Sequence, residues 1–173
     1  YIDRASSDLK SYFLQAAYKN EKTLIKALVF GGHEVTYQAW YGIDAETLKT
    51  DRRFNFAGIY TDDNGETRFY ENEVDDYKQD HIQLHWSQRI NNYWSTSLGL
   101  NYTRGKGFFE QYKEDEDLEE YGLNPSNDNN SDPSVTDLVR RRWLDNDFYV
   151  LNALVNYSKA GLDLVFGGSY SLY

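Results

Sequence analysis

Hydrophobic and polar residues alternate along three pairs of segments in this chain. Successive side chains of a β-strand point to opposite faces of its sheet, so strict alternation is typical of strands with one apolar face. Polar dipeptides such as Asn20-Glu21 and Asn91-Asn92 separate the two members of a pair. The pattern therefore predicts an all-β fold, an antiparallel meander of long hairpins. The six main strands are expected at residues 9–19, 22–31, 77–90, 93–104, 146–158 and 161–172.

The two faces of the predicted sheet differ in chemistry. The apolar and aromatic face is expected to hold Tyr12, Leu14, Tyr18, Ile25, Val29, Leu84, Trp86, Leu98, Leu100, Tyr149, Leu151, Val155, Leu164 and Phe166. The polar face is expected to hold Lys26, His81, Gln83, His85, Arg89 and Asn156. A soluble sandwich also alternates, but it needs two apolar inner faces of matching size, and these polar faces do not supply the second. Tyrosines that bracket small apolar residues favour the lipid-facing band of a transmembrane barrel with a wet lumen.

The connections between the predicted strands alternate between very short and very long. The long ones are residues 31–76 and 104–145, and short turns at one end with long loops at the other are typical of outer-membrane barrels. In the first, Asn64-Gly65 lies between aromatic flanks and predicts a small hairpin. In the second, the acidic residues 114–120 are a candidate short helix, and the polar residues 124–134 are expected to form a flexible loop tip.

Composition narrows the functional classes. With 16 Tyr and a mean hydropathy of −0.78, the chain has few aliphatic residues for a closed core but too many aromatic residues for disorder. Its net charge of −10 argues against nucleic acid as a partner, because binding phosphates needs clustered Lys and Arg. The absence of cysteine excludes disulfides and thiolate metal sites.

No motif predicts catalysis, a cofactor or a metal site. His81 and His85 share a face, but four strand residues separate them by ~13 Å, too far to hold one metal ion. His33-Glu34 lacks the second histidine of a metalloprotease motif, and Asp62 to Glu66 lacks the spacing of a calcium loop. We therefore expect the protein not to be an enzyme.

Aromatic residues just beyond two of the strands are the candidate ligand-binding residues. Such side chains can form stacking platforms for sugars or aromatic chelates, and they can equally pack long loops together. Both interpretations stay open at this point. The candidates are Tyr37, Trp40, Tyr41, Phe108, Phe109 and Tyr112.

Three stretches, residues 30–40, 102–113 and 142–149, resemble the barrel of TonB-dependent outer-membrane receptors, and the likeness runs over almost the whole chain. The resemblance implies that the chain is part of a large barrel, with extracellular loops and without the plug domain. Both ends of the chain are then expected to be cuts inside a longer receptor. It also implies the outer membrane of a Gram-negative bacterium, with its lipid as a partner. Such a receptor imports a scarce small ligand (an iron chelate, haem, cobalamin or a glycan), driven by an inner-membrane energy-coupling protein.

Two alternatives to the receptor are retained. The first is a soluble or surface-displayed β-domain that binds a protein or polysaccharide, and the second is a passive porin or adhesin barrel. The size of the second apolar face distinguishes a sandwich from a barrel wall.

Overall fold

The computed structural model describes residues 1–123 and 134–173, and it is mainly antiparallel β, with 67% strand and 5% helix. Most of the polar run predicted as a loop tip, residues 124–133, lies outside the described residues. Among the described residues no helix is long enough and apolar enough to cross a membrane.

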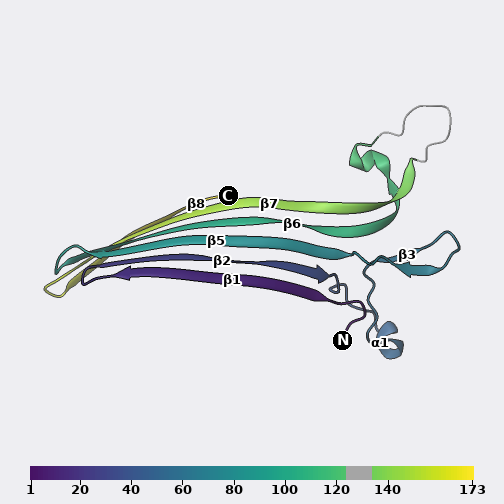
Figure 1. Cartoon of the computed structure of the whole chain (residues 1–173), viewed down its shortest axis with the longest axis horizontal. Helices are drawn as coiled ribbons and strands as arrows, with labels where there is room; N and C mark the ends of the chain where they lie inside the picture. Colours follow the sequence, from purple (N-terminus) through teal and green to yellow (C-terminus); the bar gives the residue numbers. More distant parts are fainter. Residues whose placement is uncertain (124–133) are drawn as a thin grey trace. The chain divides into compact units, whose positions relative to one another are not determined.

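One sheet contains the six main strands. They are β1 (Ser7–Lys19), β2 (Thr23–Tyr37), β5 (Val74–Arg89), β6 (Trp94–Asp117), β7 (Val135–Lys159) and β8 (Leu162–Leu172). Each strand is hydrogen-bonded to the next in this order, from purple β1 to yellow β8 in Figure 1. Strands β7 and β8 pair antiparallel, with Tyr149 opposite Leu172 and Lys159 opposite Leu162. The predicted all-β, six-stranded antiparallel sheet is confirmed, and the described strands form an open sheet and not a closed barrel.

Short-range chemistry explains the tight turns between paired strands. The Asn20 side-chain oxygen accepts hydrogen bonds from the backbone N–H groups of Lys22 and Thr23, at 2.9 and 2.7 Å. Asn91 does the same for the backbone N–H groups of Tyr93 and Trp94, at 2.8 and 3.0 Å. The last turn uses Ala160 and Gly161, whose φ angles are 52° and 81°. A side-chain acceptor thus replaces the missing backbone partner in the first two turns, while a left-handed dipeptide reverses the third.

The prediction that residues 104–145 form a long loop is wrong. Strand β6 continues to Asp117 and β7 begins at Val135, so most of that segment is strand. The charged residues that suggested a loop are paired across strands, for example Arg104 Nη1 with Asp147 Oδ2 at 2.7 Å, so the ladder continues through them. Of the acidic residues 114–120 predicted as a short helix, residues 114–117 belong to β6, and the helix present is the short 3-10 helix η1 (Leu118–Tyr121).

The first long connection is shorter than predicted, because β2 extends to Tyr37 and β5 begins at Val74. Within it lie a short helix, α1 (Thr47–Thr50), and the expected hairpin of β3 (Ile59–Thr61) and β4 (Thr67–Phe69). At the tip of this hairpin Gly65 has a φ of 77°, which explains the Asn-Gly sequence.

The chain divides into two compact units. Unit 1 comprises residues 1–8, 35–76 and 108–143, and unit 2 comprises residues 9–34, 77–107 and 144–173. The buried hydrophobic residues of the described chain, Tyr37 and Ala57, both belong to unit 1. None of the described hydrophobic residues of unit 2 is buried, so that unit has no hydrophobic core of its own.

Candidate functional site

Two pairs of aromatic rings bound an apolar strip on unit 2. Trp94 of β6 packs on Tyr157 of β7 with ring centroids 4.7 Å apart, and Tyr102 packs on Tyr149 at 4.9 Å. Each strand has nine residues from one ring to the other, counting both ends. A transmembrane β-strand needs about 9–11 residues to cross the hydrocarbon core. The aromatic pairs therefore mark a strip whose length matches a bilayer.

The strip is exposed and apolar. It includes a groove lined by Ile82, Leu84, Leu100, Tyr102, Tyr149, Leu151 and Tyr170, which lie on β5, β6, β7 and β8. Leu14 on β1 and Phe166 on β8 are 68% and 60% exposed. Four of the groove residues are among those that alternation predicted to share the apolar face. An apolar face of this extent needs a covering that the described residues do not provide.

The opposite face of unit 2 is polar and hydrogen-bonded within itself. The ring of His81 stacks on Phe30 with centroids 4.6 Å apart. Its Nδ1 lies 3.0 Å from Thr103 Oγ1, and its Nε2 lies 3.2 Å from Gln79 Oε1. A second cavity is lined by the polar residues His85, Ser87, Ser97 and Asn152, by small residues, and by Leu98 and Leu154. Its polar side chains suit contact with water.

Unit 1 is organised around a buried carboxylate, Glu110 of β6, which is 2% exposed. Tyr70 Oη donates a hydrogen bond of 2.6 Å to Glu110 Oε1, and Asn72 donates to the same oxygen. Arg141 of β7 forms an ion pair with Glu110 Oε2. Gln38 Nε2 donates to the Glu110 backbone oxygen at 3.2 Å. Glu110 thus ties β6 to β7 and to the connection between β2 and β5.

The charge of Glu110 is stabilised by these partners. Burial acts to raise the pKa of Glu110, but the hydrogen bonds from Tyr70, Asn72 and Arg141 outweigh it and hold the pKa below its usual value. Burial and the bond to the carboxylate together raise the pKa of Tyr70 to about 12. The Glu110 cluster is therefore an ionised structural centre, in which neither group is poised to exchange a proton near neutral pH.

Glu73 is a second buried carboxylate in unit 1, at 3% exposed. Its Oε2 accepts a hydrogen bond of 3.0 Å from the backbone N–H of Tyr112. Burial raises the pKa of Glu73, and backbone hydrogen bonds from Tyr112 and Gly58 only partly offset it. Burial acts to raise the pKa of both glutamates, but the net shifts are opposite, because of the two only Glu110 forms an ion pair with a cation among the described residues.

The aromatic residues predicted to bind ligand in the first long connection differ in how exposed they are. Tyr37 is buried, and its hydroxyl lies 3.1 Å from the Ala57 oxygen and 2.8 Å from the Tyr70 oxygen. Trp40 and Tyr41 stack on one another at 4.5 Å and are 66% and 45% exposed. A cavity of about 430 Å³ is lined by Trp40 and also by Tyr37, together with Ser6, Ser7, Thr36, Gln38 and Asp75. The hydroxyl of Tyr37 is therefore bonded within the loop, whereas the rings of Trp40 and Tyr41 are exposed.

The aromatics predicted on β6 mainly make packing contacts. Phe108 packs on Trp143 at 4.8 Å, with the Arg141 guanidinium 4.4 Å from its ring centroid, and Phe109 lies 5.6 Å from that of Arg142. Tyr112 packs against Tyr60 at 4.5 Å and donates a hydrogen bond of 2.7 Å to Asp137. These side chains join β6 to its neighbours.

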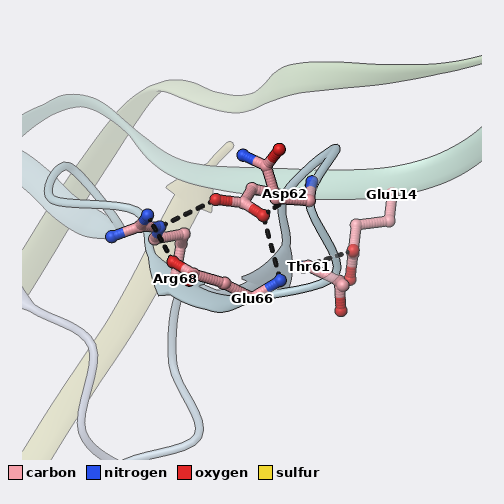
Figure 2. Close-up of polar contacts among 6 residues, drawn as sticks. Thr61, Asp62, Glu66, Arg68 and Glu114 are labelled. Atoms are coloured by element: carbon pink, nitrogen blue, oxygen red, sulfur yellow. Dashed lines mark hydrogen bonds and ion pairs between the residues drawn. The ribbon is translucent and has the colours of Figure 1, made fainter.

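The β3–β4 hairpin of unit 1 is held by its own tip residues, as Figure 2 shows. Asp62 accepts hydrogen bonds from the backbone N–H groups of Asn64 and Glu66, at 3.0 and 2.9 Å, and from Arg68 Nε at 2.9 Å. Glu114 of β6 accepts from the Thr61 N–H at 2.7 Å. The carboxylates labelled in Figure 2 thus hold the hairpin and its contact with β6.

Sequence reasoning missed the Glu110 cluster. Glu110 lies forty residues from Tyr70 and thirty-one from Arg141, and no spacing rule joins them. The available signal was a single acidic residue among aromatic neighbours in residues 108–112.

The described residues contain no group of three or more His, Cys, Asp or Glu side chains placed to hold a metal ion. In the comparisons with known proteins, no family model and no curated protein matches the chain.

Proposed function

We propose that this chain is part of the wall and outer loops of an outer-membrane transport barrel of the TonB-dependent receptor kind. In this proposal the apolar face of unit 2 contacts lipid, and the polar face lines a wet lumen. One observation carries it: unit 2 is a six-stranded, two-faced sheet in which no described hydrophobic residue is buried. A soluble sheet of that size would bury its apolar face against a second layer.

The dimensions of the apolar strip support lipid as the covering. The eight steps from Trp94 to Tyr102 span roughly 26 Å along the strand. At the usual barrel tilt of about 40°, this is roughly 20 Å along the membrane normal, comparable to an apolar band of about 25 Å between aromatic girdles. The paired rings at both ends have the amphipathic character that suits a membrane interface.

The soluble β-domain is the weaker alternative. It would require the face that carries His81, His85 and Asn152, or a second layer, to supply a matching apolar surface. The polar face instead carries polar side chains that hydrogen-bond to one another, such as His81 and Thr103. No observation favours the porin or adhesin alternative.

Within this proposal, the exposed Trp40–Tyr41 pair contributes to ligand capture. The two stacked rings are exposed, and Trp40 also lines a cavity, so the pair offers a flat apolar surface and polar edges to a sugar or a chelate. Import would be driven by an inner-membrane energy-coupling protein acting through parts of the receptor outside this chain. This chain alone is therefore proposed to contact ligand and lipid, and not to transport.

Light scattering with and without detergent tests the proposal. Two open sheet edges and an uncovered apolar face should make the chain associate in plain buffer, and a neutral detergent should disperse it. A monodisperse monomer in plain buffer with a cooperative thermal transition would contradict the proposal and favour the soluble β-domain.

A further inference from the structure

Charged side chains border one end of the apolar groove of unit 2, which has a volume of about 390 Å³. Side chains two residues apart in a strand lie on the same face of the sheet. In steps of two from the groove, each of β5, β6 and β7 reaches two charged residues on the groove's own face. We call these six residues the rim cluster: Lys78 and Asp80 on β5, Arg104 and Lys106 on β6, and Asp145 and Asp147 on β7.

Hydrogen bonds join the rim cluster to the tyrosines of the apolar face. Tyr102, which lines the groove, donates a hydrogen bond of 2.5 Å from its hydroxyl to Asp147 Oδ1. Tyr12, which alternation assigns to the same face, donates one of 2.8 Å to Asp80 Oδ1. The rim cluster therefore belongs to the face proposed to contact lipid and not to the polar face.

Positive and negative charges are balanced within the rim cluster. Lys78 Nζ lies 3.1 Å from Asp80 Oδ2, and Arg104 pairs with both Asp145 and Asp147. Unit 2 as a whole carries nine Lys and Arg against six Asp and Glu, a net charge of +3. The rim cluster has three cations and three carboxylates, so its net charge is zero. A ligand at the rim thus meets charges of both signs.

Lys106 and Asp145 are the least tightly paired members of the rim cluster. Lys106 Nζ lies 3.5 Å from Asp145 Oδ2, which is longer than the roughly 2.7–3.2 Å of a good N–H···O hydrogen bond. The two side chains are 58% and 46% exposed. An ammonium group has three N–H donors and a carboxylate has about four acceptor positions. This pair therefore offers a donor and an acceptor side by side at the end of an apolar groove.

We propose that the groove and the rim cluster together bind one phospholipid whose head is a phosphoethanolamine group, with a phosphate and a primary ammonium. One acyl chain lies in the groove, the phosphate contacts Lys106, and the ammonium contacts Asp145. This inference rests on the proposed function, because it takes the apolar face of unit 2 as lipid-facing.

The position of the rim cluster suits a lipid head. Arg104 comes two residues after Tyr102, which is roughly 7 Å along the strand. The headgroup layer beside the hydrocarbon core is roughly 5–8 Å thick. Lysine places its ammonium at the level of the phosphates while its stem stays on apolar surface, as Lys106 can do here.

The balance of charges selects among headgroups. An anionic head brings one negative charge to Lys106 but leaves the carboxylates beside it facing a like charge, which is unfavourable. A choline head is zwitterionic, but its quaternary ammonium has no N–H to donate to Asp145. A primary ammonium supplies both the opposite charge and the hydrogen bonds.

Native mass spectrometry of the full chain, released from neutral maltoside micelles, counts the lipids bound. The probes are phosphatidylethanolamine, phosphatidylcholine and phosphatidylglycerol with identical dioleoyl chains at equal concentration. One phosphatidylethanolamine should bind per chain, in a population at least fivefold larger than that of either other lipid. Asp145→Asn leaves one cation uncompensated and should raise binding of phosphatidylglycerol about fivefold, the effect of one cation near an anionic headgroup.

Two double variants with unchanged net charge locate the site. Lys106→Gln/Asp145→Asn should reduce binding of phosphatidylethanolamine at least fivefold, to the level of phosphatidylcholine. Arg89→Gln/Glu21→Gln is the matched control, because it also removes one cation and one carboxylate from unit 2, but from the cavity beside the short turns. It should change binding less than twofold. Circular dichroism checks that both variants retain the sheet.

Three outcomes would overturn the inference: equal binding of the three lipids, equal effects of the two double variants, or displacement of phosphatidylethanolamine by an equal concentration of chain-free glycerophosphoethanolamine. The last would show a headgroup site to which the groove contributes nothing. Failure of the proposed function is distinguishable, because it would appear as a monodisperse monomer in plain buffer. Failure of this inference alone would leave the association in buffer and its dispersal by detergent unchanged.

Discussion

Tyr102 and Tyr149 stack across the neighbouring strands β6 and β7, with ring centroids 4.9 Å apart and ring planes inclined by 26°. Trp94 and Tyr157 pack at the other end of the same two nine-residue segments, with ring centroids 4.7 Å apart and ring planes inclined by 50°. Cross-strand aromatic pairs stabilise a sheet, but here no second layer covers them. The pairs therefore define the two ends of an exposed apolar band. A charged side chain introduced between these ends should destabilise the protein in a lipid bilayer.

An arginine should be tolerated on one face of β6 and not on the other. Leu98→Arg places a charge near the middle of the proposed lipid-facing band, where it should cost about 2–4 kcal/mol of unfolding free energy. Ser97→Arg places the same charge on the polar face, beside His85, and should cost less than about 1 kcal/mol. Urea unfolding in phosphatidylcholine vesicles, followed by tryptophan fluorescence, measures both. Equal costs would contradict the assignment of faces.

We expect that only glycine at position 105 of β6 leaves room for the contact between Tyr77 of β5 and Asn146 of β7. A Cβ atom at this position would overlap the hydroxyl oxygen of Tyr77 on β5, which bonds to Asn146 Oδ1 on β7 at 3.2 Å. Gly105→Ala should therefore destabilise the sheet by about 1–3 kcal/mol. In a double-mutant cycle, Tyr77→Phe should reduce that cost because it removes the overlapping oxygen. Strictly additive effects would show that the crossing contact is unimportant.

The contributions of the two buried glutamates to the free energy of unfolding should change with pH in opposite directions. The pKa of Glu110 is lowered in the folded state, so its stabilisation is present above the unfolded value of about 4.5 and is lost as the pH falls through the folded pKa. Glu110→Gln should thus cost about 1–3 kcal/mol at pH 7 and much less at pH 3. Urea unfolding at both pH values measures this, and a cost that does not change with pH would contradict it.

Glu73→Gln is the matched control. The pKa of Glu73 is raised in the folded state, so its contribution is present below the unfolded pKa and is lost as the pH rises through the folded pKa. Relative to the wild type, this variant should gain stability between pH 4 and pH 7. A relative loss over that range would show that Glu73 has a compensating cation.

Substitutions at Trp40 and Tyr37 should have different effects, the first on ligand affinity and the second on the stability of the fold. Trp40→Ala removes an exposed stacking surface and should weaken ligand binding about 5–10-fold without changing stability. Tyr37→Phe removes a buried hydroxyl and should lower stability by about 1 kcal/mol without changing affinity. Calorimetric titration with ferric chelates, haem, cobalamin and oligosaccharides measures affinity. Equal loss of affinity in both variants would mean that Trp40 acts only through loop structure.

The parts of the fold that were predictable are those set by local pattern. Period-two alternation predicted β8 and the C-terminal end of β7 near their observed limits, although β7 begins at Val135 and not at residue 146. Asn64-Gly65 predicted the small hairpin. Alternation of hydrophobic and polar residues cannot show where a strand ends if the strand continues through charged residues that form ion pairs with the next strand. For this reason β6 was expected to end at residue 104 and instead reaches Asp117.

The candidate site was only partly predictable for a related reason. Aromatic composition predicted Tyr37, Trp40 and Tyr41 alike as ligand-binding candidates, but it could not show that Tyr37 alone is buried. Burial of Tyr37 depends on which carbonyl oxygens lie within reach of its hydroxyl. Likewise, the contact between Glu110 and Arg141 depends on the pairing of β6 with β7.

The most direct test of the central claim is the accessibility of single spin labels in lipid. The chain has no cysteine, so one introduced thiol gives one label. With the chain in phosphatidylcholine vesicles, labels at positions 98, 100, 151 and 155 should be accessible to oxygen dissolved in the bilayer. Labels at positions 97, 99, 152 and 156 should instead be accessible to a water-soluble nickel chelate. A two-residue alternation along both strands is the predicted result. Protection of the first set from both reagents, as inside a soluble core, would contradict it.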